Sequence, residues 1–397
     1  MLTRRFSRLE GILERTIKLL FLGDFLLSGQ FVQQAQTDPG WNPFTDPTLA
    51  ALIQRHDIVV GSLDCTLVGK GRTIEGDRII LKTDSLALAA LRKLNVSVVT
   101  LATNHAFDFG ADGFEETQMQ LSRLSVLTVG AGKGEAEAYA PVLVQVSGLR
   151  LACLAAADLA TSAVGAGPGT PGVASLFPVE QLEAQVRSAK SNSDLVFVLL
   201  HWGTEWYRLP APEQRSIARR LVRAGADAII GNHPHVIQAF EYVEQRPVFY
   251  ALGNAVAADV PQSAGCMLKQ LRPNLESLAV SIGVSTGELR ALQVWKLEYS
   301  AKRGLTVRGM YRAPFVQQWA MRAAPDGPFY RAIWAFYCGL MELVFIPVRY
   351  CLFGHGVGYA LKRFTIGAWR RRLRALSARA SVGKAPAGHN GGVACRR

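Results

Sequence analysis

Short apolar runs that end in polar loops recur along the first two thirds of the chain. The runs have the length of buried strands, and several segments between them carry apolar residues at helical spacing, as over 84–94. The predicted strands are 16–22, 57–61, 96–101, 125–129, 140–146, 149–156, 195–200, 228–230 and 247–252, and the predicted helices are 48–56, 84–94, 113–124, 179–189 and 213–224. Strands that alternate with helices, with a hairpin at Ser147-Gly148, indicate an α/β fold with parallel and antiparallel pairing.

The pattern changes after about residue 270. Residues 278–284 and 289–297 are predicted to form a pair of strands. Residues 329–347 are apolar and aromatic and lie near the lower limit for a membrane span, but Glu342 would cost roughly 2.5–3.5 kcal/mol at a bilayer centre. We expect an in-plane membrane-binding or re-entrant helix here; a helix packed on the body and a true span are the alternatives.

Polar residues follow the predicted strands directly. They are Asp24, Asp64, Asn104, His105, His201, His233 and His235. In α/β folds, ligands gather beyond the carboxyl ends of the strands, and carboxylate, amide and imidazole groups are ligands of divalent metals. His233 and His235, separated only by Pro234, are the most informative part of this pattern because the proline fixes the backbone between two imidazoles. The sequence therefore predicts a metal-dependent hydrolase.

The chemistry assigns a role to each group. Asp24 and Asp64 are the natural carboxylates, and Asp64 is the better candidate to bridge two metals roughly 3.5–4 Å apart. Asn104 can offer a carbonyl oxygen, and the remaining histidines can offer nitrogens. His105 is not needed as a ligand and could act on the substrate, as a general acid or as a cation near the developing charge.

Each residue alone also has an ordinary structural interpretation. Asp24 could cap a turn, Asp64 could be an N-cap or simply solvated, and His201 could be a core histidine beside Trp202. Asp108 suits a turn position and is expected to steady the loop through backbone bonds or to hold the His105 ring. The ordinary interpretation is harder to sustain for all the strand-end residues together.

The net charge of +13 is concentrated at the C-terminal end. Beyond Glu342 the sequence has no Asp or Glu and carries 11 positive charges, which leaves about +2 for residues 1–342. A nearly neutral body argues against a nucleic-acid groove, whereas a basic segment beside an apolar stretch favours an anionic membrane surface. A disordered, solvated tail is the alternative for residues 380–397.

Neither the cysteines nor the N-terminus indicates export. The six cysteines show no paired or metal-like spacing, so no disulfide framework is expected, and Cys153 is predicted to pack as a small hydrophobic residue. The apolar run at 17–22 follows several arginines but is short and ends in Gly23-Asp24. We expect a core strand, no signal peptide, and a cytoplasmic protein that is peripheral on the inner face of the membrane.

Seven segments resemble the CapA family of capsule-synthesis, or poly-γ-glutamate biosynthesis, proteins, which belong with the metallophosphoesterase-like (calcineurin-like) folds. They cover about residues 17–256, and the last three are long and specific. The segments are 20–24 (Leu-Phe-Leu-Gly-Asp), 61–64 (Gly-Ser-Leu-Asp), 102–110 (Ala-Thr-Asn-His-Ala-Phe-Asp-Phe-Gly), 129–132 (Val-Gly-Ala-Gly), 201–205 (His-Trp-Gly-Thr-Glu), 225–238 with Asn-His-Pro-His at 232–235, and 250–254 (Tyr-Ala-Leu-Gly-Asn).

The resemblance implies a four-layer α/β/β/α sandwich, to which this chain adds a C-terminal helical, basic extension. It implies one or two divalent ions (Mn, Fe or Zn) and His105 as the catalytic histidine of an Asn-His step. The implied metal ligands are Asp24, Asp64, Asn104, His201, His233 and His235, and the residues expected to contact substrate or support the ligands are Asp108, Glu205 and Asn254.

Three positions depart from the pattern of these proteins. Metallophosphoesterases usually carry a histidine two residues after the first aspartate, where this chain has Leu26, so one metal site loses a ligand. CapA-like proteins commonly have Asn-Leu-Glu where this chain has Ser62-Leu63-Asp64, which keeps a shorter carboxylate. The usual N-terminal membrane anchor is missing, and the C-terminal apolar and basic segment could replace it.

We therefore expect a CapA-type metal-dependent hydrolase, acting on a phosphoester, in the synthesis of a capsule or poly-γ-glutamate-like envelope polymer. The alternatives are a γ-glutamyl amide hydrolase and a non-catalytic scaffold of an envelope polymer synthase that binds polymer. The expected partners are an anionic polymer or phosphoester, synthase subunits and a membrane surface through residues 329–379. The expected domains are an N-terminal extension (1–16), the CapA-like domain (17–312), an apolar and basic helical extension (313–379) and a disordered tail (380–397).

Overall fold

The computed structural model describes residues 15–38, 40–69, 79–261, 267–325 and 327–345. The chain divides into a unit of residues 1–336, which holds all the described sheets, and a unit of residues 337–397. The domain boundaries expected from the sequence stay predictions. The N-terminal extension up to residue 14, the basic segment from residue 346 and the tail at 380–397 lie outside the described residues.

The first large sheet is built around the N-terminal strand. In this sheet β1 (Ile17–Leu26), β2 (Ile58–Leu63), β5 (Val96–Thr100) and β6 (Leu127–Val129) run parallel. On the other side of β1, the strands β18 (Glu276–Ser285), β19 (Glu288–Ser300) and β20 (Gly304–Met310) continue the sheet antiparallel. β15 (Asn254–Ala257) pairs with the end of β1. The predicted strand pair after residue 270 is thus confirmed as β18 and β19.

The second large sheet consists of six strands in the order β13-β14-β12-β11-β9-β8. Its four inner strands, β14 (Arg246–Phe249), β12 (Ala228–Asn232), β11 (Leu195–His201) and β9 (Leu149–Ala157), run parallel. The edge strands β13 (Phe240–Val243) and β8 (Val142–Val146) run antiparallel to their neighbours. Every residue of β11 is buried, as a continuous apolar run predicts for a strand covered on both faces.

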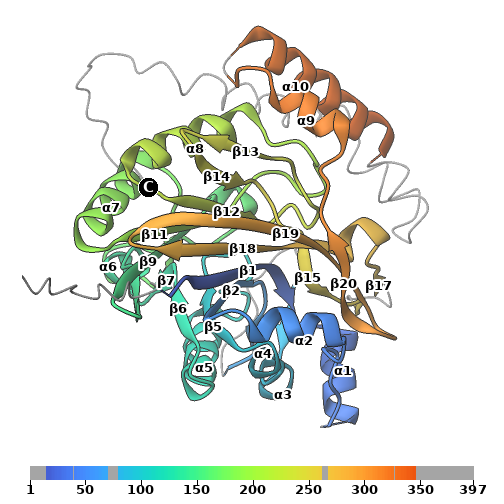
Figure 1. The fold of residues 1–397 in the computed structure, drawn as a ribbon. Helices are drawn as coiled ribbons and strands as arrows, with labels where there is room; N and C mark the ends of the chain where they lie inside the picture. Colours follow the sequence, from blue (N-terminus) through green and yellow to red (C-terminus); the bar gives the residue numbers. More distant parts are fainter. Residues whose placement is uncertain (1–14, 39, 70–78, 262–266, 326, 346–397) are drawn as a thin grey trace, which may run out of the picture. The chain divides into compact units, whose positions relative to one another are not determined.

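The two sheets pack face to face, with helices outside each (Figure 1). Between the sheets the Phe21 and Phe197 rings lie 5.3 Å apart. The helices α3 (Ser85–Leu88), α4 (Ala90–Lys93) and α5 (Gly110–Arg123) cover the first sheet, and α7 (Val179–Asn192) and α8 (Pro212–Ala224) cover the second. The expected four-layer α/β/β/α sandwich is therefore present.

The remaining elements are short or lie at the margins. They are α1 (Gln30–Thr37), α2 (Pro47–Gln54), β3 (Thr66–Leu67), β4 (Lys82–Thr83), β7 (Ala131–Gly132), α6 (Glu135–Ala138), η1 (Leu159–Thr161), β10 (Gly172–Val173), β16 (Val260–Pro261), β17 (Met267–Leu268), η3 (Arg272–Asn274), α9 (Phe315–Met321), α10 (Pro328–Leu340) and η4 (Met341–Phe345). Among the described residues no helix has the length and apolarity needed to cross a membrane.

Some sequence predictions need correction. The first strand does not end at Gly23-Asp24 but runs on to Leu26, because β15 pairs with its last residues. The single helix predicted over 84–94 is two short helices, α3 and α4, which meet at Ala89. The strand predicted to reach residue 252 ends at Phe249. Cys153 is buried and unpaired in β9, as expected.

A buried arginine attaches α9 and α10 to the second sheet. Arg215 of α8 is 1% exposed, and its guanidinium lies over the Tyr330 ring of α10, 4.3 Å from the centroid. It donates to both Glu241 oxygens, at 3.1 and 2.7 Å, and to the carbonyl oxygens of Ala323 and Met321, at 2.9 and 3.0 Å. One side chain thus caps the end of α9 and neutralises a half-buried carboxylate.

Replacing Arg215 with alanine should destabilise the protein by about 3–5 kcal/mol, because it leaves the Glu241 carboxylate without its main buried partner. The matched control is Arg223→Ala on the same helix, where an exposed pair with Glu244 predicts about 0–1 kcal/mol. Urea unfolding with circular dichroism measures both. Equal losses for the two variants would contradict the prediction.

Candidate metal centre

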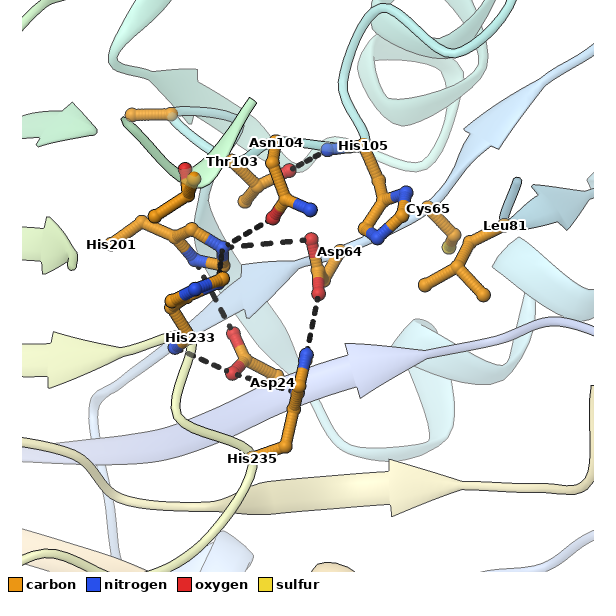
Figure 2. Close-up of polar contacts among 12 residues, drawn as sticks. Asp24, Asp64, Cys65, Leu81, Thr103, Asn104, His105, His201, His233 and His235 are labelled. Carbon is orange, nitrogen blue, oxygen red and sulfur yellow. Dashed lines mark hydrogen bonds and ion pairs between the residues drawn. The ribbon is translucent and has the colours of Figure 1, made fainter. Parts of the chain in front are cut away.

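The strand ends of both sheets meet at one place. Asp24 lies near the end of β1, Asp64 directly follows β2, and Asn104 lies in the loop after β5. From the second sheet, His201 is the last residue of β11, and His233 directly follows β12. All these strands run parallel within their sheets, so their carboxyl ends share an edge, and Figure 2 shows the side chains converging there.

Glycines allow the close backbone approach that this convergence requires. A Cβ atom on Gly23 would lie 1.9 Å from the Gly253 carbonyl oxygen, and that same oxygen accepts the backbone N–H of Asp24 at 3.0 Å. A Cβ atom on Gly231 would likewise lie 1.9 Å from the Tyr250 carbonyl oxygen. A side chain at either position would push apart the strands that carry the site.

The double-histidine turn has an unusual backbone. His233 has a φ of 94° and His235 a φ of 56°, values that residues with a Cβ atom rarely adopt. The backbone N–H of His233 donates to Oδ2 of Asp24 at 3.0 Å, which fixes the turn to the opposite sheet. Backbone strain of this kind collects at functional sites.

Asp24, Asp64 and His235 form one group of donor atoms. Their ligand atoms all lie within 4.8 Å of one another. Nδ1 of His235 is 3.8 Å from Asp24 Oδ2, and Nε2 is 3.9 Å from Asp64 Oδ2 (Figure 2). These distances are too long for hydrogen bonds, but they are within twice a metal–ligand distance of roughly 2.0–2.2 Å.

A second group surrounds His201. Its Nε2 atom lies 2.7 Å from Oδ1 of Asn104, 3.1 Å from Nδ1 of His233 and 3.9 Å from Oδ1 of Asp64. A proton on Nε2 could serve only one of these acceptors well, whereas a cation could be bound by all of them. Asp64 faces both groups, the position expected of a bridging carboxylate.

Several buried polar atoms in this cluster lack a hydrogen bond. Among the described residues, nothing donates to Oδ1 of Asp24 or to either oxygen of Asp64, and Nδ1 of His201 makes no hydrogen bond, its nearest charged neighbour being Oδ1 of Asp24 at 3.9 Å. Both aspartates are 0% exposed. An unsatisfied buried carboxylate is costly, so these atoms fit a bound cation better than an empty core.

The protonation states suit a cation as well. Burial and the nearby Asp64 carboxylate raise the pKa of Asp24 to about 7. Burial and the neighbouring imidazoles lower the pKa of His201 and of His233 well below the usual value. Both rings are therefore neutral at pH 7, the form that binds metals.

His105 stands beside these groups with its ring fixed. Its Nδ1 atom is 2.7 Å from Oδ2 of Asp108, and that oxygen also accepts the backbone N–H of Leu81 at 2.8 Å. Asp108 thus makes both contacts expected of it, a bond to the loop backbone and a bond to the His105 ring. His105 and Asp108 are both buried.

The other predicted residues differ in their contacts. Oδ1 of Asn254 lies 2.9 Å from Nδ1 of His235, so this amide orients a candidate ligand. Glu205 lies half-buried in the loop after β11, and among the described residues it makes no hydrogen bond or ion pair with the site. Asn274, which the sequence did not single out, donates to the His235 carbonyl at 2.9 Å, while its own carbonyl accepts from Asn254. No local pattern marks it.

A family model described as "Bacterial capsule synthesis protein PGA_cap" matches residues 18–259. The "PGA biosynthesis protein CapA" of Bacillus subtilis (strain 168) is 31% identical over 241 residues, which cover 59% of this chain and 62% of that protein. The "Capsule biosynthesis protein CapA" of Bacillus anthracis is 30% identical over 246 residues, covering 60% and 59%. The matched region thus spans about three fifths of the length of these relatives.

Solved structures show a weaker likeness. A hypothetical protein from Thermus thermophilus aligns with a TM-score of 0.46 at 16% identity, over 71% of this chain and 99% of that chain. A 5'-nucleotidase precursor from the same organism aligns with a TM-score of 0.42 at 18% identity, over 81% and 59%. Scores this low carry no argument about this chain.

The raised pKa of Asp24 predicts a pH-dependent stability of the metal-free protein. Its carboxyl binds a proton more tightly when folded (about 7) than in its ordinary state (3.8), so its contribution to stability falls as pH rises between these values. Asp24→Asn removes that loss. Its melting temperature relative to wild type should therefore rise from pH 5 to pH 8 in chelator-treated protein.

Glu115→Gln is the matched control, because it removes the charge of an exposed carboxylate paired only with Lys133. It should leave the pH profile unchanged. If the melting temperature of Asp24→Asn depended on pH as that of wild type does, ionisation of Asp24 would not destabilise the folded protein. Adding Mn²⁺ should stabilise wild type more than Asp24→Asn.

Proposed function

The chain belongs to the bacterial capsule synthesis family PGA_cap, and we propose that it is a metal-dependent hydrolase of a phosphoester in the synthesis of a capsule or poly-γ-glutamate-like envelope polymer. One observation carries the proposal: carboxylate, amide and imidazole groups of both sheets converge at one buried point, where three carboxylate oxygens make no hydrogen bond within the described residues. This donor set is typical of divalent-metal hydrolases.

The donors divide into two groups that share Asp64, and each group could hold an ion. Asp24, Asp64 and His235 would hold one ion, and Asp64, Asn104, His201 and His233 would hold the other. Mn, Fe or Zn fits such a mixture of oxygen and nitrogen ligands. A divalent ion bound there supplies a Lewis acid that polarises a phosphoryl oxygen and activates water.

The side chains around the ions would orient and protonate the substrate. Because Nδ1 of His105 is engaged by Asp108, a proton passed to the leaving group would come from Nε2. Asn254 and Asn274 hold His235 through its ring and its carbonyl, so the ring keeps its orientation when substrate binds. Glu205 is proposed to contact substrate from the loop after β11.

Leu26 favours a second candidate function. It is 3% exposed and paired with Ala257, at the position where metallophosphoesterases usually carry a histidine. The position of His235 therefore lacks one ligand, and a weak second metal would reduce turnover. In this alternative the protein is a scaffold of an envelope polymer synthase and uses the site to bind an anionic polymer. Hydrolysis of a γ-glutamyl amide is a further alternative.

We predict that purified protein contains Mn, Fe or Zn, measured by elemental mass spectrometry. His233→Ala should remove most of it, because this position has the fuller ligand set. Asn254→Ala should weaken affinity about 10–100-fold through the freed His235 ring. Metal content at background in wild type, with no uptake after dialysis against Mn²⁺, would rule out the metal centre.

His105→Ala should keep its metal and lose about 10²–10⁴-fold in turnover, because it removes only the proton donor. Mono- and bis-(4-nitrophenyl) phosphate and a γ-glutamyl anilide, each with Mn²⁺, make up the substrate panel. Arg223→Ala, which removes an exposed side chain of α8 paired with Glu244, is the control. Metal binding without turnover of any substrate supports the scaffold, and activity on the anilide alone supports the amidase.

A further inference from the structure

Exposed apolar side chains are concentrated on α9 and α10. Phe315 is 74% exposed, Val316 68%, Trp319 44%, Phe329 58% and Phe336 76%. We call these five residues the α9–α10 surface. On α9 they lie at i, i+1 and i+4, and on α10 at i and i+7, so each helix presents one side. The rings of Trp319 and Phe329 meet edge to face at 5.7 Å, which makes the surface continuous across the two helices.

The opposite sides of these helices are already bound to the body. Tyr330 is 0% exposed, and its hydroxyl donates to the Pro210 carbonyl at 2.7 Å. The Trp334 ring lies 5.5 Å from the Tyr207 ring. Because the inner side of α10 packs on the loop after β11, the α9–α10 surface is not a core face left over from folding.

The charges around the surface are positive. Arg312, Arg322 and Arg331 are exposed, and within the described residues none of them makes an ion pair. Between Arg312 and Phe336 the sequence has a single acid, Asp326. The sequence after Glu342 adds 11 further cations and no acid. Aromatic side chains flanked by unpaired arginines match the apolar and anionic layers of a lipid surface.

We propose that the α9–α10 surface docks on an anionic lipid bilayer, with its aromatic side chains among the acyl chains and its arginines at the lipid phosphates. The contact is in-plane. It includes α9, which the sequence did not single out, as well as α10. The inference does not depend on hydrolysis at the metal centre. Docking would hold the candidate metal centre close to the bilayer, because α10 is fixed to the loop that follows His201.

The test is co-sedimentation of the full chain with vesicles of phosphatidylcholine alone or mixed with an equal part of phosphatidylglycerol. Wild type should bind the mixed vesicles, and binding should weaken as salt rises. Phe315→Ser with Phe336→Ser should weaken that binding at least about tenfold, because the surface loses its two most exposed rings. This variant keeps the whole basic C-terminal segment.

The matched control is Leu143→Ser with Tyr242→Ser, which removes two side chains that are each 57% exposed from the edge strands β8 and β13. It should bind like wild type. Equal binding by the Phe315/Phe336 variant would overturn the proposal in favour of the basic segment alone.

Sedimentation velocity tests whether a second copy of the chain covers the surface instead. A dimer in wild type that the variant dissociates, with no change in vesicle binding, also overturns the proposal. The Phe315/Phe336 variant should keep wild-type metal content and wild-type turnover on soluble substrates. A loss of membrane binding is thereby distinguished from a failure of the proposed hydrolase.

Discussion

The main physical constraint on this structure is the burial of two carboxylates at the junction of its two sheets. Asp24 and Asp64 come from neighbouring parallel strands and are enclosed where the two sheets meet, with three of their oxygens unsatisfied among the described residues. Such burial opposes folding by several kcal/mol unless positive charge compensates. Burial lowers the pKa of His201 and of His233, so these two rings are neutral and do not compensate it. These unsatisfied oxygens lie where strands of both sheets end, which is why we propose a cation there.

The parts of this arrangement that could be predicted from the sequence are local. Apolar runs mark β1, β2, β11 and β12, and a polar residue at the end of each run marks the site, so both follow from neighbouring residues. The parts that could not be predicted depend on distant pairing. β15 extends β1 past Asp24, Asn274 supports His235 across a chain separation of 39, and Arg215 binds α9 across about a hundred residues. Neither a periodic pattern nor a motif in the sequence indicates such contacts.

The two groups of candidate metal ligands differ in the number of donor atoms that they bring together. His201 has three candidate ligand atoms within 3.9 Å of one nitrogen, drawn from both sheets. The group at His235 has two carboxylates and one ring. His235 is nevertheless oriented by Asn254 and held in a positive-φ backbone. The His235 ring thus keeps a fixed orientation although its group has fewer candidate ligands. A side chain without a function would not need such support.

The long-range pairing of β1 also has a consequence for the order of synthesis. Ile17 pairs with Val284, and the hydroxyl of Tyr330 binds the carbonyl of Pro210, in the loop that follows His201. A ribosome releases the N-terminus first, so β1 can pair with β2 early but meets β18 only after residue 284 has been made. The first sheet is therefore completed only after every candidate ligand has been synthesised.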